Sequence, residues 1–436
     1  MTRHVVIVGG GFGGTALARR LERRLPEGWQ LTLVSEESTT TFNPLLAEVV
    51  GAAVFPEQVV APIREMLKSS RFVMGRVTRV DGQARTLRLS TLAGPLDLPY
   101  DHLVLAFGTR ANLDLVPGSP KHALPLKLVG DAMFIRNRVL QRLARIELES
   151  DAARRRLLGG FVVIGGGFSG VEVAGALADF IRGALRAYPR VAPDEPSVTL
   201  LHDGERLLPE LPASLGEAAA RSLAARGVRV RLGARAAAVQ AEGVALADGG
   251  FIEGATVVCT IGTRANPLVE QLGLALQRGR IPVAPDLSVP QRPGLWALGD
   301  CALVPNGDGT PCPPTAQFAV AQARALADNL LATLEGTPTR PFSHRSRGMM
   351  ATTGHLKGVA QVGGLSLSGL PAWLLWRAYY LLLMPTWGRK LRIWVEWSWS
   401  MFFSADITHL RFTRTAEADA EPVPGQPLPT PSQPTV

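Results

Sequence analysis

Cysteine is scarce in this chain. Its 436 residues include only three cysteines, Cys259, Cys301 and Cys312. None of them forms a CxxC pair or has the spacing of zinc ligands, so the sequence indicates neither a thioredoxin-like redox motif nor a structural metal site. We therefore expect a protein of a reducing compartment, without disulfides and without a bound metal.

A hydrophobic run long enough to cross a bilayer is also missing. A membrane-spanning helix needs roughly twenty apolar residues. The longest candidate, Leu370–Met384, has about fifteen residues and includes Arg377, so we expect that it does not span a membrane. No signal peptide is expected either, because the first predicted strand begins at His4, directly after the initiator.

Acidic residues are rare in one region, residues 340–414. This region holds ten Lys and Arg against two Asp and Glu, a net charge of +8, whereas the whole chain carries +9. Nearly all of the excess positive charge therefore lies near the C-terminus. A basic surface of this kind favours contact with nucleic acid or with anionic lipid.

The tryptophans of the same region distinguish between these two partners. Six of the eight tryptophans fall within Leu370–Phe403, beside aliphatic residues and Arg389, Lys390 and Arg392. Tryptophan rings and cations next to apolar residues suit the headgroup region of a bilayer. We therefore predict that residues 341–414 bind an anionic lipid surface and that the protein does not bind nucleic acid. A dimer interface or a core-packing helix remains an alternative.

Two glycine-rich motifs are present, 156 positions apart. Each follows a run rich in Val and Ile, has the spacing GxGxxG and leads into a helix-like pattern. The glycines are Gly9, Gly11 and Gly14 in the first copy and Gly165, Gly167 and Gly170 in the second. The pattern is typical of a strand, a tight turn and a helix N-terminus that binds a pyrophosphate. Two copies predict two dinucleotides on one chain; the alternative is that one copy is a decayed repeat.

Candidate ribose-binding residues follow the second strand of each unit. Glu36 follows the predicted strand Leu31–Val34, at a position where an acidic side chain usually binds the adenosine ribose. Glu37 is the second choice, and a solvated surface carboxylate is the alternative. His202 occupies the matching place after the predicted strand Val198–Leu201.

Three further turns carry residues suited to a cofactor. The buried run Tyr100–Thr109 ends in the sequence AFGT, with Thr109 last, and a later run ends in TIGT, which contains Gly262. Asp300 ends an apolar strand within Gly294–Ala302, where it would face the carboxyl ends of a parallel sheet. An ordinary turn aspartate is the alternative for Asp300.

Three other segments bear on the fold and the site. Pro313–Leu334 begins with two prolines and continues as a predicted helix that carries Gln317 and Gln322; taken alone, both could be surface amides. An Arg-rich helix is predicted over Asp131–Leu158. The apolar segment Thr41–Leu46 is predicted to be a loop over a cofactor.

Together these motifs resemble one known family. The sequences GGGFSGVEVAG, PPTAQFAVAQA, GLWALGDCA and SGLPAWLLWR resemble those of the type II, non-proton-pumping NADH:quinone dehydrogenases, which belong to the two-dinucleotide-binding flavoproteins. The resemblance covers roughly residues 3–413. It implies an FAD-dependent enzyme that passes a hydride from NADH to FAD and two electrons on to a membrane quinone.

The resemblance also implies roles for the candidate residues. FAD would lie with its pyrophosphate at Gly9–Gly14, its ribose at Glu36 and its ribitol chain at Asp300. NADH would lie at Gly165–Gly170, with its nicotinamide near Glu172. Glu172 would act in proton handling, although a carboxylate at a helix start can equally be a partner of the helix dipole.

The same resemblance places the quinone and the membrane. Gln317 and Gln322 would line the quinone pocket, and the basic, Trp-rich segment would hold this pocket against the membrane. The expected location is the cytoplasmic face of the inner (plasma) membrane, as a peripheral protein. A homodimer stays open as a further partner.

The fold class implied is α/β, with two Rossmann-like dinucleotide-binding domains, the FAD/NAD(P)-linked reductase fold, and C-terminal amphipathic helices that associate with the membrane. The predicted FAD-binding domain is discontinuous. The ranges are 1–125 and 283–340 for the FAD-binding domain, 126–282 for the NAD(P)H-binding domain, 341–414 for the membrane-anchoring region and 415–436 for a proline-rich, disordered tail.

Three positions depart from the family pattern. Ser35 separates the predicted strand from Glu36, and Ala321 stands in place of the first of two adjacent glutamines. His202 stands where an acid is common, with Asp203 beside it. An acid there favours NADH because it binds the ribose 2′-hydroxyl and repels a 2′-phosphate. The histidine therefore leaves NADPH open as a substrate.

Three other functions compete with this one. A sulfide:quinone oxidoreductase needs a pair of redox cysteines near the flavin, and neither Cys259 nor Cys301 has an obvious partner. A soluble reductase with a small protein or a disulfide as acceptor is the second alternative, and the missing CxxC argues against its disulfide version. The third is a non-enzymatic, NADH-sensing flavoprotein whose C-terminal segment binds a protein.

Overall fold

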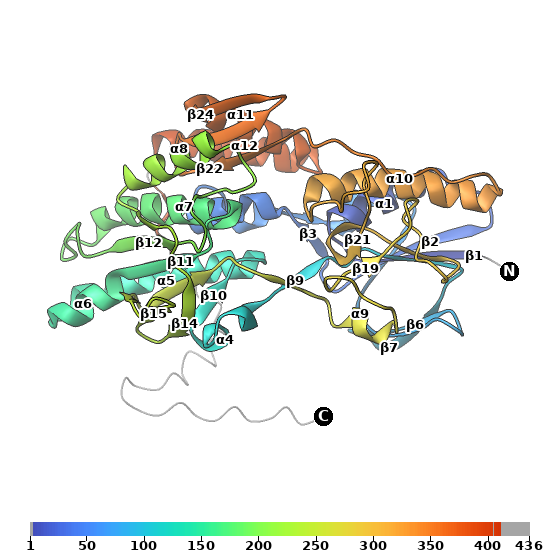
Figure 1. The fold of residues 1–436 in the computed structure, drawn as a ribbon, viewed down its shortest axis with the longest axis horizontal. Helices are drawn as coiled ribbons and strands as arrows, with labels where there is room; N and C mark the ends of the chain where they lie inside the picture. The colour runs from blue at the N-terminus through green and yellow to red at the C-terminus, as the bar shows by residue number, and fades with distance from the viewer. Residues whose placement is uncertain (1–2, 404, 411–436) are drawn as a thin grey trace.

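The computed structural model describes residues 3–403 and 405–410, so the predicted tail 415–436 lies outside the described residues. Two lobes lie next to each other, each built on one sheet (Figure 1). The strand before each glycine motif lies inside its sheet and is mostly buried. Runs of Val and Ile form such strands because both faces of the sheet are covered.

The first sheet has seven strands in the order β20-β8-β1-β2-β5-β6-β7. Its bounds are β1 (Arg3–Val8), β2 (Trp29–Ser35), β5 (Arg71–Asp81), β6 (Thr86–Thr91), β7 (Gly94–Pro99), β8 (His102–Leu105) and β20 (Leu295–Ala297). The pairs from β20 to β5 are parallel, and β5, β6 and β7 pair antiparallel. Helix α1 (Phe12–Leu21) follows the first glycine turn and packs along α10 (Ala316–Glu335).

The second sheet has five parallel strands in the order β10-β17-β11-β12-β13. Its bounds are β10 (Ala123–Pro125), β11 (Gly160–Ile164), β12 (Ser197–Leu201), β13 (Arg229–Arg231) and β17 (Thr256–Cys259). The helices of this lobe are α4 (Ser119–His122), α5 (Val129–Leu148), α6 (Ala152–Gly159), α7 (Phe168–Ala184) and α8 (Ala213–Ala224). Helix α7 follows the second glycine turn, as α1 follows the first.

Short sheets and helices complete the described chain. The strands are β3 (Thr39–Thr41) with β4 (Val60–Pro62), β9 (Thr109–Ala111) with β18 (Thr263–Ala265), β14 (Ala236–Gln240) with β15 (Gly243–Leu246) and β16 (Phe251–Glu253), β19 (Ile281–Pro282) with β21 (Ala302–Leu303), and β22 (Gly348–Thr352) with β23 (Gly358–Val362) and β24 (Leu365–Gly369). The remaining helices are α2 (Leu46–Val50), α3 (Ile63–Met66), α9 (Leu268–Gln271), α11 (Leu370–Leu383) and α12 (Trp387–Phe402).

The chain crosses between the lobes at points that differ from the predicted boundaries. β10, predicted at the end of the first domain, pairs with β17 of the second sheet. Leu268 and Val269, predicted in the second domain, are buried in the core of the first lobe. The crossing itself is the antiparallel pair β9 and β18. These three-residue strands contain no hydrophobic run, so the sequence carries little signal for where the lobes meet.

A segment near the N-terminus packs into the second lobe. Thr41–Leu46, predicted to be a loop, includes a 3-10 turn, Asn43–Leu45, that leads into α2. Val49 and Val50 of α2 are buried in the core of the second lobe, and α2 packs against α5 and α7. The loop prediction was therefore wrong for Asn43–Leu46. Pro44 favours the start of a helical segment here because its φ suits the first turn.

The Arg-rich helix predicted over Asp131–Leu158 is two helices. Helix α5 ends at Leu148 and α6 begins at Ala152. Asp151 caps α6, because its Oδ1 accepts hydrogen bonds from the backbone N–H groups of Ala153 and Arg154 at 2.8 and 2.9 Å. An aspartate in the middle of a basic helical pattern was the available signal for this break.

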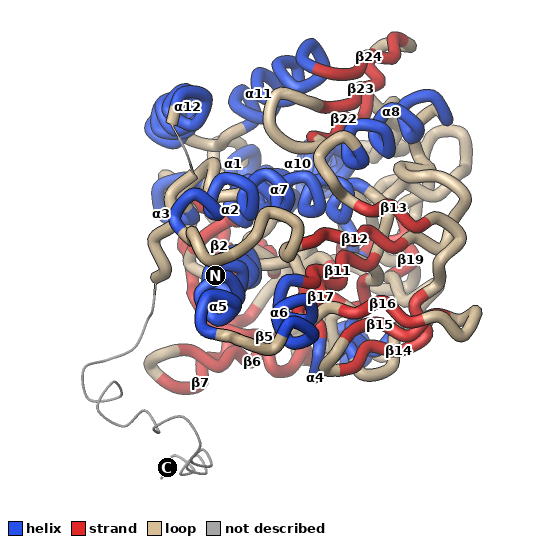
Figure 2. The backbone as a smooth tube through the Cα atoms, turned by 90° about the vertical axis from the view of Figure 1, so that its left-hand side faces the viewer, coloured by secondary structure: helices blue, strands red, loops and turns tan. Residues whose placement is uncertain are grey.

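The C-terminal helices α11 and α12 confirm the predicted helical region. Helix α11 packs on the sheet β22-β23-β24 and, together with α12, lies on one side of the second lobe (Figures 1 and 2). No helix among residues 3–403 and 405–410 is long and apolar enough to cross a membrane. The six tryptophans divide by exposure: Trp373, Trp376 and Trp397 are buried, and Trp387, Trp394 and Trp399 are exposed. Half of the predicted interface tryptophans therefore belong to the core.

Candidate active site

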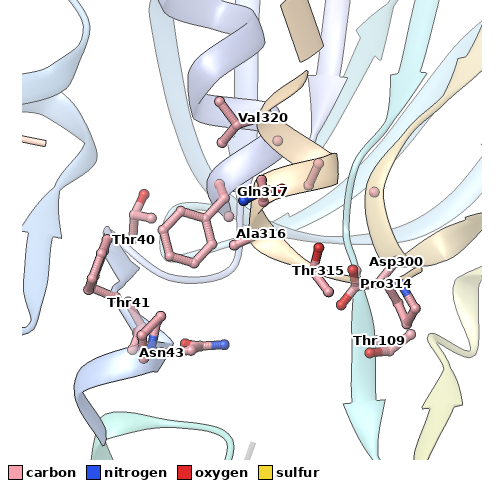
Figure 3. A pocket seen from close by; sticks show the side chains of 18 of the residues that line it. Thr40, Thr41, Asn43, Thr109, Asp300, Pro314, Thr315, Ala316, Gln317 and Val320 are labelled. Carbon is pink, nitrogen blue, oxygen red and sulfur yellow. The ribbon is translucent and has the colours of Figure 1, made fainter. Parts of the chain in front are cut away.

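One cavity of about 2200 Å³ is lined by residues of both lobes and reaches both glycine turns. A pocket for one drug-sized ligand occupies roughly 300–1,000 Å³, so this cavity has room for more than one ligand. In Figure 3, Thr40 and Asn43 lie across the pocket from Thr109 and Asp300. Gln317, near the N-terminus of α10, lies between these two walls.

The two glycine turns have the same geometry where their helices begin. Gly11 caps α1 with φ −78° and ψ −169°, and Gly167 caps α7 with φ −78° and ψ −171°. A Cβ atom added at either glycine would meet no protein atom within 4 Å. The first N–H groups of α1 and α7 therefore lie at open positions on the cavity wall, where they can bind a pyrophosphate.

The other glycines of each turn hold the helix against the strand. Gly9 and Gly165 have φ of 124° and 118°, a conformation that only glycine adopts easily. A side chain at Gly14 would collide with the carbonyl oxygen of Gly9, and a side chain at Gly170 with that of Gly165. The same contacts recur in both copies, which argues against the second copy being a decayed repeat.

Glu36 lies at the cavity wall, directly after β2. Its Oε2 accepts a hydrogen bond from Arg110 at 2.8 Å and lies 3.6 Å from Arg76 Nε. Its side chain is 30% exposed, so the two arginines hold a partly buried carboxylate at the cavity edge. Arg110 was not predicted as a site residue, although it follows Thr109 directly. Thr40 was not predicted either; its Oγ1 donates to the carbonyl oxygen of Gly10 at 2.6 Å.

Thr109 carries an unpaired, buried hydroxyl group. Thr109 lines the cavity, and its Oγ1 is buried without a hydrogen-bond partner among the described residues. Such a hydroxyl costs about 1–3 kcal/mol when unpaired, so a polar group of a ligand is its expected partner. Asp300 lies near Thr109 (Figure 3). Burial raises the pKa of the Asp300 carboxyl, against the charges of Lys127 and Arg280.

His202 packs beneath the second glycine turn. Its Nδ1 accepts a hydrogen bond from the Gly166 N–H at 3.3 Å and lies 3.4 Å from Asp203 Oδ1. The ring is 13% exposed, whereas the Asp203 side chain is 70% exposed. Gly262 also lines the cavity, with φ 81°. The arrangement leaves the carboxylate of Asp203, rather than the ring of His202, as the more accessible group.

Glu172 lies where α7, β22 and α11 meet. Its Oε1 accepts hydrogen bonds from the Thr352 N–H and from Trp376 Nε1, both at 3.1 Å. The residue is 9% exposed and lines the cavity. Burial raises the pKa of the Glu172 carboxyl to about 8, and the charge of Glu48 contributes to this shift. A carboxyl group that titrates near neutral pH can donate or accept a proton.

The two predicted glutamines point to different places. Gln317 lines the cavity, and its Oε1 accepts a hydrogen bond from the Arg347 N–H at 3.0 Å. Gln322 is 2% exposed, and its Oε1 accepts from the Gly299 N–H at 2.8 Å. Gln322 therefore holds the turn that carries Asp300 and does not reach the cavity. Tyr379 and Tyr380 of α11, which the sequence analysis did not single out, line the cavity.

Comparisons with known proteins identify the class and then the family. Residues 3–323 match the family model described as pyridine nucleotide-disulphide oxidoreductase. The type II NADH:quinone oxidoreductase of Mycobacterium tuberculosis is 32% identical over 418 residues, which cover 92% of this chain and 88% of that protein. The demethylphylloquinone reductase of Synechocystis is 30% identical over 90% of this chain and 95% of that protein.

A solved structure supports the fold. The structure of NDH2 from Plasmodium falciparum in complex with NADH superposes with a TM-score of 0.87, at 18% sequence identity, and covers 94% of this chain and 100% of that one. The chain is thus a pyridine nucleotide-disulphide oxidoreductase in its fold. Within that class it belongs to the type II NADH:quinone oxidoreductases, and the family resemblance and the α/β fold class predicted from the sequence are confirmed.

The open position at Gly167 allows a direct test of the second nucleotide site. Gly167→Ala should weaken NADH binding at least tenfold, about 1.4 kcal/mol, because the new methyl group occupies the space of the pyrophosphate. The melting temperature should not change, since the methyl group meets no protein atom. Gly183→Ala, also in α7 and also open, is the control. Anaerobic titration of the FAD-loaded protein measures the affinity, and equal affinities of wild type and Gly167→Ala would contradict the assignment.

The buried Glu172 predicts a pH-dependent stability. The folded protein holds the Glu172 proton up to about pH 8, whereas the unfolded chain releases it near the ordinary value of 4.5. This contribution to stability is complete below pH 4.5 and is lost as the pH rises to about 8. The melting temperature of Glu172→Gln should therefore fall less than that of wild type between pH 4.5 and about pH 8, as measured by differential scanning fluorimetry. The same slope in both proteins would show that Glu172 titrates normally.

Proposed function

We propose that the protein is an FAD-dependent NADH:quinone oxidoreductase that takes a hydride from NADH and reduces a membrane quinone without pumping protons. The observation that carries this proposal is the pair of matching glycine turns that open on one cavity. A cavity with two such turns can hold two dinucleotides with their reactive rings close together. FAD, when bound, supplies the two-electron relay between the nicotinamide and the quinone.

The residues at the first turn suit FAD. The helix N-terminus after Gly11 binds the pyrophosphate, and Glu36 binds the adenosine ribose at the rim. The unpaired hydroxyl of Thr109 and the partly buried carboxyl of Asp300 can hydrogen-bond the rest of the cofactor. Arg110 orients Glu36 through its 2.8 Å hydrogen bond.

The second turn suits a pyridine nucleotide. Gly167 opens the helix N-terminus to the pyrophosphate, and Asp203 is accessible to the ribose hydroxyls. A carboxylate there favours NADH over NADPH because it repels a 2′-phosphate. We assign NADH as the substrate on this ground, with NADPH as the competitor to be tested.

The quinone is assigned to the part of the cavity between Gln317 and α11. The Gln317 amide can hydrogen-bond a quinone oxygen, and Tyr379 and Leu383 provide an apolar wall. Glu172 supplies or accepts a proton at its carboxyl group. Gln322 acts indirectly, because it holds the Gly299 N–H and so positions Asp300.

The sulfide:quinone alternative fits the site less well. Its chemistry needs a thiolate near the flavin, and thiolates, not thiols, are the reactive species. Cys301 is 2% exposed, and burial raises the pKa of its thiol to about 12. Cys259 and Cys312 are likewise buried free thiols.

The reaction itself is tested by stopped-flow absorbance of the flavin in the purified, FAD-loaded protein. NADH should bleach the flavin, and a short-chain quinone added next should restore its colour. NADPH in place of NADH should bleach it much more slowly if Asp203 binds the ribose. A flavin that NADH does not bleach would remove the second nucleotide site from the function.

We further propose that α11 and α12 bind an anionic membrane surface. Trp387, Leu391 and Trp394 are more than half exposed on α12, and Lys390 and Arg392 lie beside them. Apolar rings next to cations suit the boundary between acyl chains and headgroups. The proposed location is the cytoplasmic face of the inner membrane, where the protein is peripheral. The alternative is that two copies of the protein dimerise through the same face of α12.

Vesicle binding tests this surface. Exchanging two exposed tryptophans for acids, Trp394→Glu with Trp399→Glu, should weaken binding to phosphatidylglycerol vesicles more than tenfold, because each ring contributes about 1.5–3 kcal/mol when buried. Phe251→Glu, on the exposed strand β16, is the control. Co-sedimentation of the double variant at the wild-type level would contradict the lipid assignment. Loss of a dimer in the double variant would instead assign the surface to self-association.

A further inference from the structure

A second buried carboxylate lies in the same cluster as Glu172. Glu48 comes from α2, near the N-terminus of the chain, and α2 packs against α7, which carries Glu172. The Glu48 side chain is 12% exposed. Glu172 and Glu48 contact consecutive residues of α11: Trp376 donates to Glu172, and Arg377 faces Glu48. Helix α11 therefore contacts two buried carboxylates that are 124 positions apart in the sequence.

Arg377 is the cation of this cluster. Its Nη2 lies 3.8 Å from Glu48 Oε2, and the residue is 8% exposed. The guanidinium lies 3.8 Å from the ring centroid of Trp373 and 4.8 Å from that of Trp397, and Nη1 donates to the Trp397 carbonyl oxygen at 3.2 Å. The two rings and this hydrogen bond fix the guanidinium beside Glu48.

The cluster has more negative groups than this one cation can neutralise. Burying an unpaired charge is expensive, and a carboxyl group without a cation takes up a proton instead. With Arg377 paired to one carboxylate, the other must be protonated. The cluster is also incompletely hydrogen-bonded, because Arg377 Nε is buried without a hydrogen-bond partner among the described residues. Its bonds can therefore rearrange when the proton moves.

We propose that Glu48 and Glu172 share one proton beside Arg377, and that, after Glu172 has given this proton to the quinone, Glu48 takes up a new proton from water and passes it to Glu172. The proposal rests on the proposed function. NADH delivers two electrons and one proton as a hydride, and quinol formation needs two electrons and two protons. The second proton must come from water, and a carboxyl pair between the cavity and the surface can supply it.

Other charged groups near the pair mark the side from which it can be reloaded. Asp179 lies seven residues after Glu172 on α7, and its charge acts on Glu48. The Asp179 carboxylate is 25% exposed and accepts hydrogen bonds from the His355 N–H at 2.6 Å and from Arg226 Nε at 3.2 Å. Tyr380 also lies near Glu172, and burial raises the pKa of its hydroxyl. Asp179 is therefore a partly exposed carboxylate on the side from which the pair takes up protons, and the His355 ring, whose pKa burial lowers, is a further titratable group there.

Infrared titration of the FAD-loaded protein, without NADH or quinone, tests the shared proton. The C=O stretching band of a protonated carboxylic acid is followed against pH. Glu48→Gln removes the negative neighbour and leaves Arg377 to favour ionised Glu172. The band should then disappear at least one pH unit lower than in wild type. Glu57→Gln, an exposed glutamate after α2, is the matched control, and Glu48→Asp should keep the wild-type titration.

The rates give a second readout. In Glu48→Gln, bleaching of the flavin by NADH should be unchanged, while its reoxidation by quinone slows by roughly tenfold or more. An unchanged infrared titration in Glu48→Gln would overturn the shared proton, even if NADH and quinone react as proposed.

If Glu48→Gln loses its FAD, the Glu172→Gln variant tests the shared proton instead. If the two glutamates share the proton, the C=O band should be absent from Glu172→Gln at neutral pH, because Glu48 is then ionised beside Arg377. A C=O band that is unchanged from wild type would overturn the proposal.

Discussion

The contact between strand and helix at each glycine turn is the constraint on which the site depends. Gly14 against Gly9, and Gly170 against Gly165, leave no room for a side chain. This contact sets the start of α1 and of α7 at the carboxyl end of its sheet, where the free N–H groups meet the cavity. Because the two turns have the same geometry and open on one cavity, two dinucleotides can approach each other there.

The C-terminal helices complete the wall of the same cavity, and they also form an outer surface of the protein. Trp376 and Trp397 are buried with α2 and α7, while other tryptophans of the same segment face outward. Helix α11 contributes Tyr380 to the cavity and Arg377 to the buried carboxyl cluster. The helix pair proposed to bind the membrane therefore also contributes to the electrostatics around Glu172. The two proposals, membrane attachment and proton supply, therefore both involve α11.

The features predicted from sequence are those with local signals. GxGxxG after a Val/Ile run predicted both turns, and a basic, Trp-rich pattern predicted α11 and α12. The lobe boundaries were misplaced because β9 and β18 are short and polar. Gln322 was expected at the cavity from the family resemblance alone, because its spacing from Gln317 does not show which face of α10 is buried. Glu48 and Arg377 went unnoticed because their pairing joins segments far apart in the chain, and no local pattern reports such a contact. The residue roles remain predictions.

The most direct measurement is a crystal structure of the FAD-loaded protein with NADH bound. The two-turn arrangement predicts the FAD pyrophosphate at the N-terminus of α1 and the NADH pyrophosphate at the N-terminus of α7. The nicotinamide should then lie against the flavin, in the part of the cavity that Glu172 lines. NADH bound away from Gly165–Gly170, or both rings held too far apart to touch, would contradict the assignment of the two turns to one reaction.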